Sequence, residues 1–269
     1  MKAALCAALL LLPATLQAQW PEFKTPSAPR TADGRVDLRA PAPRTADGRP
    51  DLSGIWDKGL MPNEVPPPGF FAGIAPSQAF RNLNAAVPGG VPLQPAAAKL
   101  KAERFGRNSK DHPDAYCLPL HPVQLHLHPQ PRKIVQTPGL VLIAYEANDG
   151  RREIFTDGRR LPTGEFEPWW YGYSVGRWEG DTLVVESTGF KDGSWLDEHG
   201  TPGSDALRVT ERFHRPDYGT LDVTVTIDDP KTMTRPFSFT LQQRLMPDTE
   251  LIEFVCGENN RSAAHLVAN

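Results

Sequence analysis

The chain has 269 residues and a formal net charge of −3, with 29 Lys and Arg residues against 32 Asp and Glu residues spread along it. Nucleic-acid binding needs a basic face, and the sequence has none, so we expect no nucleic-acid partner. No segment beyond the N-terminus is long and apolar enough to span a bilayer, so we also expect no membrane span.

The first 18 residues have the pattern of a secretory signal peptide. One lysine precedes an unbroken apolar run from Ala3 to Leu12, and small residues follow as far as Ala18. We expect cleavage after Ala18, which predicts a periplasmic or secreted protein. A lipoprotein is the less favoured alternative, because Cys6 lies inside the apolar run rather than at the cleavage site.

Residues 19–53 form a proline-rich segment that contains a tandem repeat. APRTADGRVDL at 28–38 is followed by APRTADGRPDL at 42–52, and each copy carries a turn-forming Asp-Gly pair. Each copy has too little apolar surface to bury, which predicts a linker or a strap laid over the domain.

The stretch LHPVQLHLHP at 120–129 contains three of the seven histidines. If this stretch is extended, His126 and His128 share a face and can reach one metal ion, with His121 as a third ligand if the proline turn folds it back. The flanking prolines favour a loop, and no HExxH spacing is present. We therefore predict no metal or other cofactor and partly exposed imidazoles, with a zinc site as the alternative.

From about residue 123 onward, short runs of alternating apolar residues are separated by turn signals, a pattern typical of an antiparallel all-β domain. The candidate strands are 133–137, 140–146, 151–156, 169–178, 182–188, 207–214, 220–228, 237–245 and 251–256. Their hairpin-length connections predict a closed barrel of eight or nine strands. We place one barrel domain at 54–269, in which the segment up to about residue 122 is an irregular Pro- and Gly-rich wrap with a single helix at 95–105.

Two cysteines remain after the expected cleavage, Cys117 and Cys256. They can pair in an oxidising compartment, or they can be two buried free thiols. Their wide separation does not fit a redox or zinc motif.

Several motifs resemble those of a family of uncharacterised secreted bacterial proteins. They are PDLSGIWD at 50–57, REIFTDGR at 152–159 and GYSVGRWEGDTLVVESTGF at 172–190. The likeness covers most of residues 50–258. It implies no particular reaction.

The tripeptide Gly54-Ile55-Trp56 is also similar to the glycine-x-tryptophan motif that opens the first strand of lipocalins and their calycin relatives. This resemblance implies a lipocalin-like barrel in which Trp56 closes the floor against an arginine of a late strand, here Arg208 or Arg212. It further implies a small apolar ligand in the barrel mouth.

Glu211 is the leading candidate for acid or base chemistry. It shares a strand face with apolar residues, so it should point into the barrel, where loss of water raises the pKa of a carboxyl group. Glu186 and Glu146 are similar candidates. The alternative is a structural ion pair inside the barrel, with Arg152 or Arg177 as the partner.

Aromatic residues are dense between residues 169 and 195. Trp169, Tyr171 and Tyr173 suit stacking on a flat ligand, which Arg152 and Glu146 would orient. His199 follows this cluster on a loop, from which it can transfer a proton near the barrel mouth. The alternatives are an ordinary core rich in tryptophan and an exposed histidine in a turn.

These features lead to two hypotheses. The first, which is favoured because Glu211, Gln243 and Glu253 are polar residues on apolar strand faces, is a cofactor-free lyase, isomerase or cyclase. It would use Glu211 or Glu186 as base and His199 as acid, on an aromatic, sugar-like or apolar substrate. The second is a non-catalytic ligand-binding protein of lipocalin type. Two or more unpaired titratable groups in one cavity would favour the enzyme, and one neutralised pair would favour binding. No GxSxG elbow, phosphate-binding loop or dinucleotide fingerprint is present.

Overall fold

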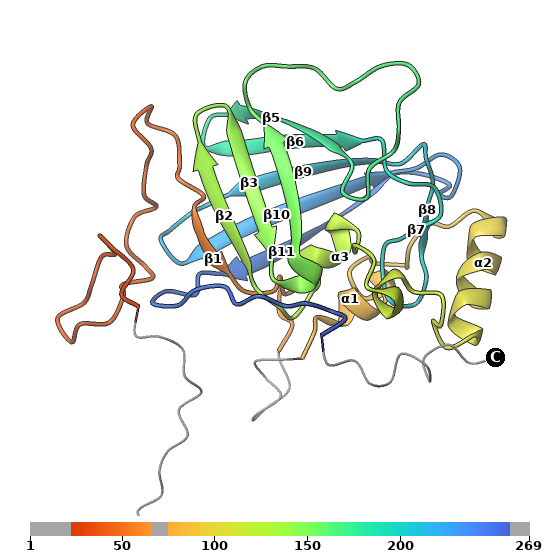
Figure 1. The fold of residues 1–269 in the computed structure, drawn as a ribbon, viewed down its shortest axis with the longest axis horizontal. Coiled ribbons are helices and arrows are strands. Elements are labelled where there is room, and N and C mark those ends of the chain that lie inside the picture. The colour runs from red at the N-terminus through yellow and green to blue at the C-terminus, as the bar shows by residue number, and fades with distance from the viewer. Residues whose placement is uncertain (1–22, 66–74, 259–269) are drawn as a thin grey trace, which may run out of the picture.

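The computed structural model describes residues 23–65 and 75–258, so the predicted signal peptide at 1–18 lies outside the described residues. Nine strands form one sheet, in the order β1-β2-β3-β4-β5-β6-β9-β10-β11 (Figure 1). Their bounds are β1 Gly54–Trp56, β2 Arg132–Thr137, β3 Leu140–Tyr145, β4 Gly150–Phe155, β5 Tyr173–Glu179, β6 Thr182–Thr188, β9 Arg208–His214, β10 Thr220–Asp228 and β11 Phe237–Arg244.

The two outermost strands of the sheet, β1 and β11, come together and nearly close the barrel. The backbone N–H of Asp57 donates to the carbonyl of Arg244 at 2.9 Å, and the N–H of Met246 donates to the carbonyl of Ile55 at 2.8 Å. A further bridge joins Leu60 to Gln242. The prediction of an all-β barrel is confirmed.

The sheet departs from the expected antiparallel arrangement at one place, the junction of β4 and β5. These strands run parallel and pair only at Ile154 with Ser174 and at Phe155 with Val175. A parallel neighbour requires a long crossover, which residues 156–172 provide. The strand expected at 169–178 therefore begins only at Tyr173, and the first half of β4 does not pair with β5.

Side-chain alternation places the core inside the barrel. In β10, Leu221, Val223, Val225 and Ile227 are fully buried and the threonines between them are partly exposed. This is the pattern of strands with one apolar face and one wet face.

The helices are α1 Gln78–Arg81, α2 Pro95–Gly106 and α3 Pro122–Leu127, with 3-10 turns at Leu83–Ala85, Pro113–Tyr116 and Ala147–Asp149. A small pair of strands, β7 Ser194–Trp195 and β8 Pro202–Gly203, lies with α2 beside one end of the barrel (Figure 1). The helix expected at 95–105 is confirmed as α2. No helix in the described part of the chain is long and apolar enough to cross a membrane.

Two expectations about secondary structure are wrong. Residues 251–256 form no strand, and β1 supplies the ninth strand instead. The histidine-rich stretch is not a loop, because α3 occupies Pro122–Leu127 and is buried throughout. A proline at the first helical position lacks only an N–H that would be unpaired in any case, so Pro122 starts this helix rather than preventing it.

The two copies of the tandem repeat adopt the same turn. The N–H of Asp37 donates to the carbonyl of Pro29, and the N–H of Asp51 donates to the carbonyl of Pro43, both at 2.8 Å. Each copy then contacts a loop of the barrel through one arginine.

The arginine of the first copy, Arg30, binds Asp248 after β11 with two hydrogen bonds, of 3.1 and 2.8 Å. That of the second copy, Arg44, binds Asp181 between β5 and β6, with bonds of 3.0 and 2.6 Å. The repeat segment is therefore laid along the barrel loops.

Trp56 packs against an arginine, as the lipocalin resemblance implies, but the arginine is Arg215. Its guanidinium lies 4.9 Å from the centre of the Trp56 ring. The expected partners, Arg208 and Arg212, are exposed, because even-numbered residues of β9 point outward while Arg215 follows the end of the strand.

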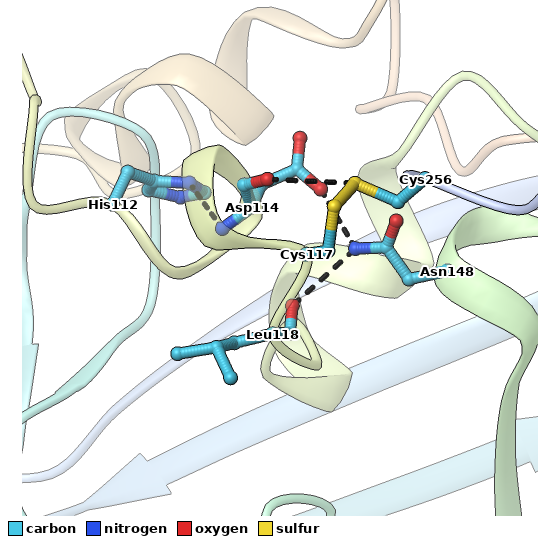
Figure 2. The surroundings of a disulfide bond; sticks show 6 residues. All are labelled: His112, Asp114, Cys117, Leu118, Asn148 and Cys256. Carbon is cyan, nitrogen blue, oxygen red and sulfur yellow. Dashed lines mark hydrogen bonds between the residues drawn. A yellow bond between two sulfur atoms is a disulfide. The ribbon is translucent and has the colours of Figure 1, made fainter. Parts of the chain in front are cut away.

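Cys117 and Cys256 are joined by a disulfide that closes a separation of 139 residues (Figure 2). The bond ties the segment after β11 to the turn at Pro113–Tyr116. Asn148 supports this turn, because its side-chain amide donates to Asp114 at 2.7 Å and to the carbonyl of Leu118 at 3.3 Å.

Replacing both cysteines by serine should lower the free energy of unfolding by about 4 to 5 kcal/mol, because the unfolded chain loses a long covalent loop. Urea unfolding of the Cys117→Ser/Cys256→Ser variant measures this loss. A reductant should destabilise the wild type by a similar amount and leave the variant unchanged. Two titratable thiols in the folded, unreduced wild type would contradict the assignment.

Candidate functional site

A buried ion pair between Arg152 of β4 and Glu211 of β9 lies inside the barrel. Arg152 is 2% exposed and Glu211 is fully buried. Arg152 Nη1 donates to Glu211 Oε1 at 2.9 Å and its Nη2 donates to Oε2. The remaining bonds of the guanidinium go to the hydroxyls of Ser174 on β5 at 3.1 Å and Ser187 on β6 at 2.8 Å. Of the two arginines considered as partners for Glu211, the structure selects Arg152.

His126 completes this network from α3. Its Nε2 lies 2.6 Å from Glu211 Oε1, and its Nδ1 lies 3.2 Å from the side-chain amide nitrogen of Gln243. Because that amide nitrogen can only donate, Nδ1 of His126 accepts and Nε2 carries the proton that is donated to Glu211. Both ring nitrogens of His126 are thus occupied.

The protonation states of the network follow from its geometry. Burial raises the pKa of Glu211, but the charge and hydrogen bonds of Arg152 and the hydrogen bond from His126 outweigh it and hold that pKa well below its usual range. Burial lowers the pKa of His126 despite the hydrogen bond with Glu211. Glu211 is therefore ionised and His126 neutral at pH 7. The expected upward shift for Glu211 is wrong, because its ion pair outweighs desolvation.

Two neutral groups near this pair have no hydrogen-bond partner in the described part of the chain, Nε2 of His121 and Oη of Tyr145. Nδ1 of His121 accepts from the N–H of Val123, so its Nε2 carries the proton. Burial lowers the pKa of His121 to about 3 and raises that of Tyr145, and the charges of Arg152 and Glu211 act on both groups.

A cleft of about 650 Å³ lies where β4 and β5 diverge. Four aromatic residues from one short segment line it, namely Trp169, Trp170, Tyr171 and Tyr173. Arg151, Arg152 and Ser174 also belong to the lining. The cleft exists because the parallel junction is short, so that the wall of the barrel is incomplete beside the first half of β4.

Several aromatic rings of the cleft contact another aromatic ring. The ring centres of Trp169 and Tyr173 are 5.4 Å apart. Tyr171 is nearly parallel to Tyr145, with 6.1 Å between the ring centres. Gly172 allows this arrangement, because its φ of +69° suits glycine and any Cβ there would lie 2.5 Å from the ring of Phe190.

Four of the five residues predicted to bind a ligand line this cleft, namely Trp169, Tyr171, Tyr173 and Arg152. The fifth, Glu146, does not line it. Glu146 is 8% exposed and precedes the turn at Ala147–Asp149, and burial raises its pKa.

The other two residues assigned to catalysis lie away from Glu211. The side chain of Glu186 is 45% exposed and pairs with Arg177 at 3.1 Å, so the expectation of a buried carboxylate is wrong. Its neighbours Val184 and Val185 are both buried, and so the sequence did not distinguish the two faces of β6. His199 packs its ring on Phe105 of α2, with 4.4 Å between the ring centres.

The three histidines considered as metal ligands contact different groups. His126 binds Glu211, His121 packs on Phe190 with ring centres 4.6 Å apart, and His128 packs on Phe80 at 5.0 Å. All three are buried rather than partly exposed as expected. Within residues 23–65 and 75–258, no group of three or more His, Cys, Asp and Glu side chains is arranged to hold a metal ion.

Sequence reasoning did not assign several residues of the interior network. Ser174, Ser187, Gln243 and Tyr145 are all buried on the inner faces of strands. For Ser187, Gln243 and Tyr145 a usable signal was present, since each shares a strand face with buried apolar residues. Ser174 had no such signal, because it is the one buried residue of β5.

Comparisons of the chain with protein-family models, with curated proteins and with solved structures found no match.

The buried histidines should make stability depend on pH. The pKa is lowered from 6.5 to about 3 for His121 and to about 4 for His128, so the unfolded chain takes up these protons first as the pH falls. Their contribution to stability is therefore complete above pH 6.5 and is lost as the pH falls toward the folded values.

In His121→Asn, asparagine can keep the N-cap bond to Val123 but does not titrate. Its unfolding free energy should fall less steeply between pH 6.5 and 4, by up to about 1.4 kcal/mol per pH unit. Urea unfolding across this range measures the slope, and a substitution of the exposed His214 serves as control. An unchanged slope in His121→Asn would mean that the His121 ring is protonated in the folded protein.

Proposed function

We propose that this protein is a secreted binding protein for small, flat organic molecules, which it holds in the cleft between β4 and residues 168–173. The observation that carries this proposal is the aromatic lining of the cleft beside two arginines. Trp169 at the rim is 40% exposed, so a ligand can reach its ring without rearrangement of the core.

The chemistry of the lining indicates the class of ligand. Trp169, Trp170, Tyr171 and Tyr173 offer ring faces for stacking, which favours an aromatic or sugar-like ring. Arg151 and Glu153 are both exposed and line the same cleft, so a substituent on the ring would find a cation to accept from and a carboxylate to donate to.

Binding is favoured over catalysis by the state of the interior. Glu211 is neutralised by Arg152 in a two-pronged pair, and both nitrogens of His126 are engaged. A general base needs an accessible lone pair and a pKa near the working pH. Neither Glu211 nor His126 meets both conditions. A single neutralised ion pair in the interior is the arrangement that we expect of a binding protein.

We propose that the protein is exported from the cytoplasm. The disulfide between Cys117 and Cys256 supports it, because such bonds persist mainly in oxidising compartments. The signal-like pattern of residues 1–18 supports the same conclusion. The compartment meant is the periplasm or the outside of the cell.

Binding can be measured with the aromatic anion anilinonaphthalene sulfonate as probe, because its fluorescence rises in apolar surroundings. Trp169→Ala should weaken its binding by roughly tenfold, since one stacking face is lost. The matched control is Trp178→Ala, since Trp178 lines a different groove under the repeat segment. Equal weakening in both variants, or none in Trp169→Ala, would contradict the cleft as the binding site.

A second candidate function is a cofactor-free lyase or isomerase. The observation that favours it is the pair of unpartnered donors, His121 Nε2 and Tyr145 Oη, near the Arg152–Glu211 pair. Neutral buried donors of this kind can stabilise negative charge that develops on a substrate oxygen.

The enzyme hypothesis is tested by screening aromatic and sugar-like compounds for turnover with wild type and with Glu211→Gln. Loss of turnover in a folded Glu211→Gln protein, with turnover kept in the exposed Glu186→Gln control, would establish Glu211 as part of a mechanism. The substitution leaves Arg152 without a counter-charge and should cost about 3 to 5 kcal/mol of stability, so folding is verified by circular dichroism. We expect no turnover by either protein.

A further inference from the structure

Arg132 at the start of β2 is a buried cation with unused hydrogen-bond donors. It is 1% exposed. Its Nη1 donates to the carbonyl of His126 near the end of α3, at 3.0 Å. Its Nε and Nη2 have no hydrogen-bond partner, and within the described ranges no carboxylate pairs with it. The charge of Asp57 acts on Arg132, but no hydrogen bond joins the two side chains.

The other buried arginines in the described chain differ from Arg132 in this respect. Arg152 is neutralised by Glu211. Arg104 donates to three backbone carbonyls of the β7 region. Arg215 donates to four carbonyls, including those of Asp51 and Tyr218. A buried charge without compensation costs several kcal/mol, so Arg132 is the position where a missing counter-charge would matter most.

A second unpartnered group faces the same region. Tyr145 lies directly opposite Arg132 in the register of β2 and β3, and both side chains point to the inner face of the sheet. Tyr145 is 3% exposed, and its hydroxyl forms no hydrogen bond of good geometry, although it lies close enough to Arg152 to help raise the pKa of that arginine. Directly opposed residues on one sheet face have their Cβ atoms about 5 Å apart. Three buried donor atoms, Nε and Nη2 of Arg132 and Oη of Tyr145, therefore lie on adjacent side chains.

We propose that Arg132 and Tyr145 bind a small monovalent anion of the size of chloride inside the barrel, between β2, β3 and the end of α3. The guanidinium lacks a counter-charge, which an anion supplies and a water molecule does not. The unpartnered acceptor Oε1 of Gln243, whose side chain also approaches the carbonyl of His126, is where a water molecule would donate instead.

The proposed site is internal, because both side chains are buried. Neither Arg132 nor Tyr145 lines the aromatic cleft, although the ring of Tyr145 stacks on Tyr171, which does. The bound anion would neutralise a buried guanidinium that has a single carbonyl acceptor, and it would stabilise the contact between α3 and β2. This role is separate from ligand binding in the cleft and does not depend on it.

An anion that binds only the folded protein stabilises it, and this stabilisation can be measured. At fixed ionic strength, replacing the bulky anion gluconate by chloride should raise the folding equilibrium constant of the wild type, approaching tenfold for each tenfold rise in chloride once the chloride concentration is well above the dissociation constant. Urea unfolding at several chloride concentrations measures this dependence. The same unfolding curve in both salts would overturn the proposal.

Variants locate the effect. Arg132→Met should abolish the chloride dependence and be no less stable than wild type in gluconate, since it removes the uncompensated charge. Tyr145→Phe removes one donor atom and should weaken the dependence while keeping the ring, which makes it decisive if Arg132→Met does not fold. Tyr116→Phe, which changes an exposed tyrosine outside both sites, is the control and should behave as wild type. Undiminished chloride dependence in Tyr145→Phe would overturn the proposal.

Crystals grown in bromide provide a direct readout. An anomalous peak within about 3.3 Å of Arg132 Nη2 or Tyr145 Oη is expected. Density without anomalous signal at that position would identify a water molecule and overturn the proposal. Because the probe is a halide, failure here leaves the binding of anilinonaphthalene sulfonate in the cleft unaffected, and the two proposals fail separately.

Discussion

The ion pair between Arg152 and Glu211 lies at the weakest part of the barrel wall. Between β4 and β5 the backbone ladder has only two paired positions. Arg152 bridges that junction with its side chain, because it reaches Ser174 on β5, Ser187 on β6 and Glu211 on β9. Four neighbouring strands are thus connected through one guanidinium. A buried pair is seldom a net gain over apolar packing, but here it joins strands where backbone hydrogen bonds are few.

The same junction creates the cleft. The long crossover before β5 returns with an aromatic segment, and its rings fill part of the space that a full-length antiparallel neighbour would occupy. Arg152 and Ser174 belong both to the ion-pair network and to the cleft lining. The cleft therefore has a floor whose charges are fixed by Glu211, and a bound molecule would meet a preorganised surface rather than a mobile one.

The sequence was sufficient for the parts of the fold that depend on local pattern. The bounds of β6 and β10 follow from alternation of apolar and polar residues, and eight of the nine expected strands exist. The direction of β5 was not accessible in this way, because a parallel neighbour is decided by where the crossover returns. Residues 251–256 have the composition of a strand, yet the chain there forms no ladder.

For the candidate site, too, the sequence predicts local features but not contacts between distant residues. Inward orientation of Glu211 follows from its place on β9, but the sign of its pKa shift depends on Arg152, which is 59 residues away in the sequence. Glu186 was placed wrongly for a related reason. With valine at both 184 and 185, each face of β6 looks apolar, and only the packed barrel decides which one is inside.

The tandem repeat shows which features are set by the local sequence and which are set by the assembled barrel. Its two copies share nearly all their residues and form the same hydrogen bonds within the turn, so that this local structure is a property of the local sequence. What each copy contacts is different, since Arg30 binds Asp248 and Arg44 binds Asp181. Nothing inside the repeat could distinguish these two aspartates, because they are brought to it by β11 on one side and by the β5–β6 turn on the other. Contacts between residues that are far apart in the sequence hold the repeat segment, the ion pair and the cleft in place. These contacts exist only in the assembled barrel, so the local sequence does not predict them.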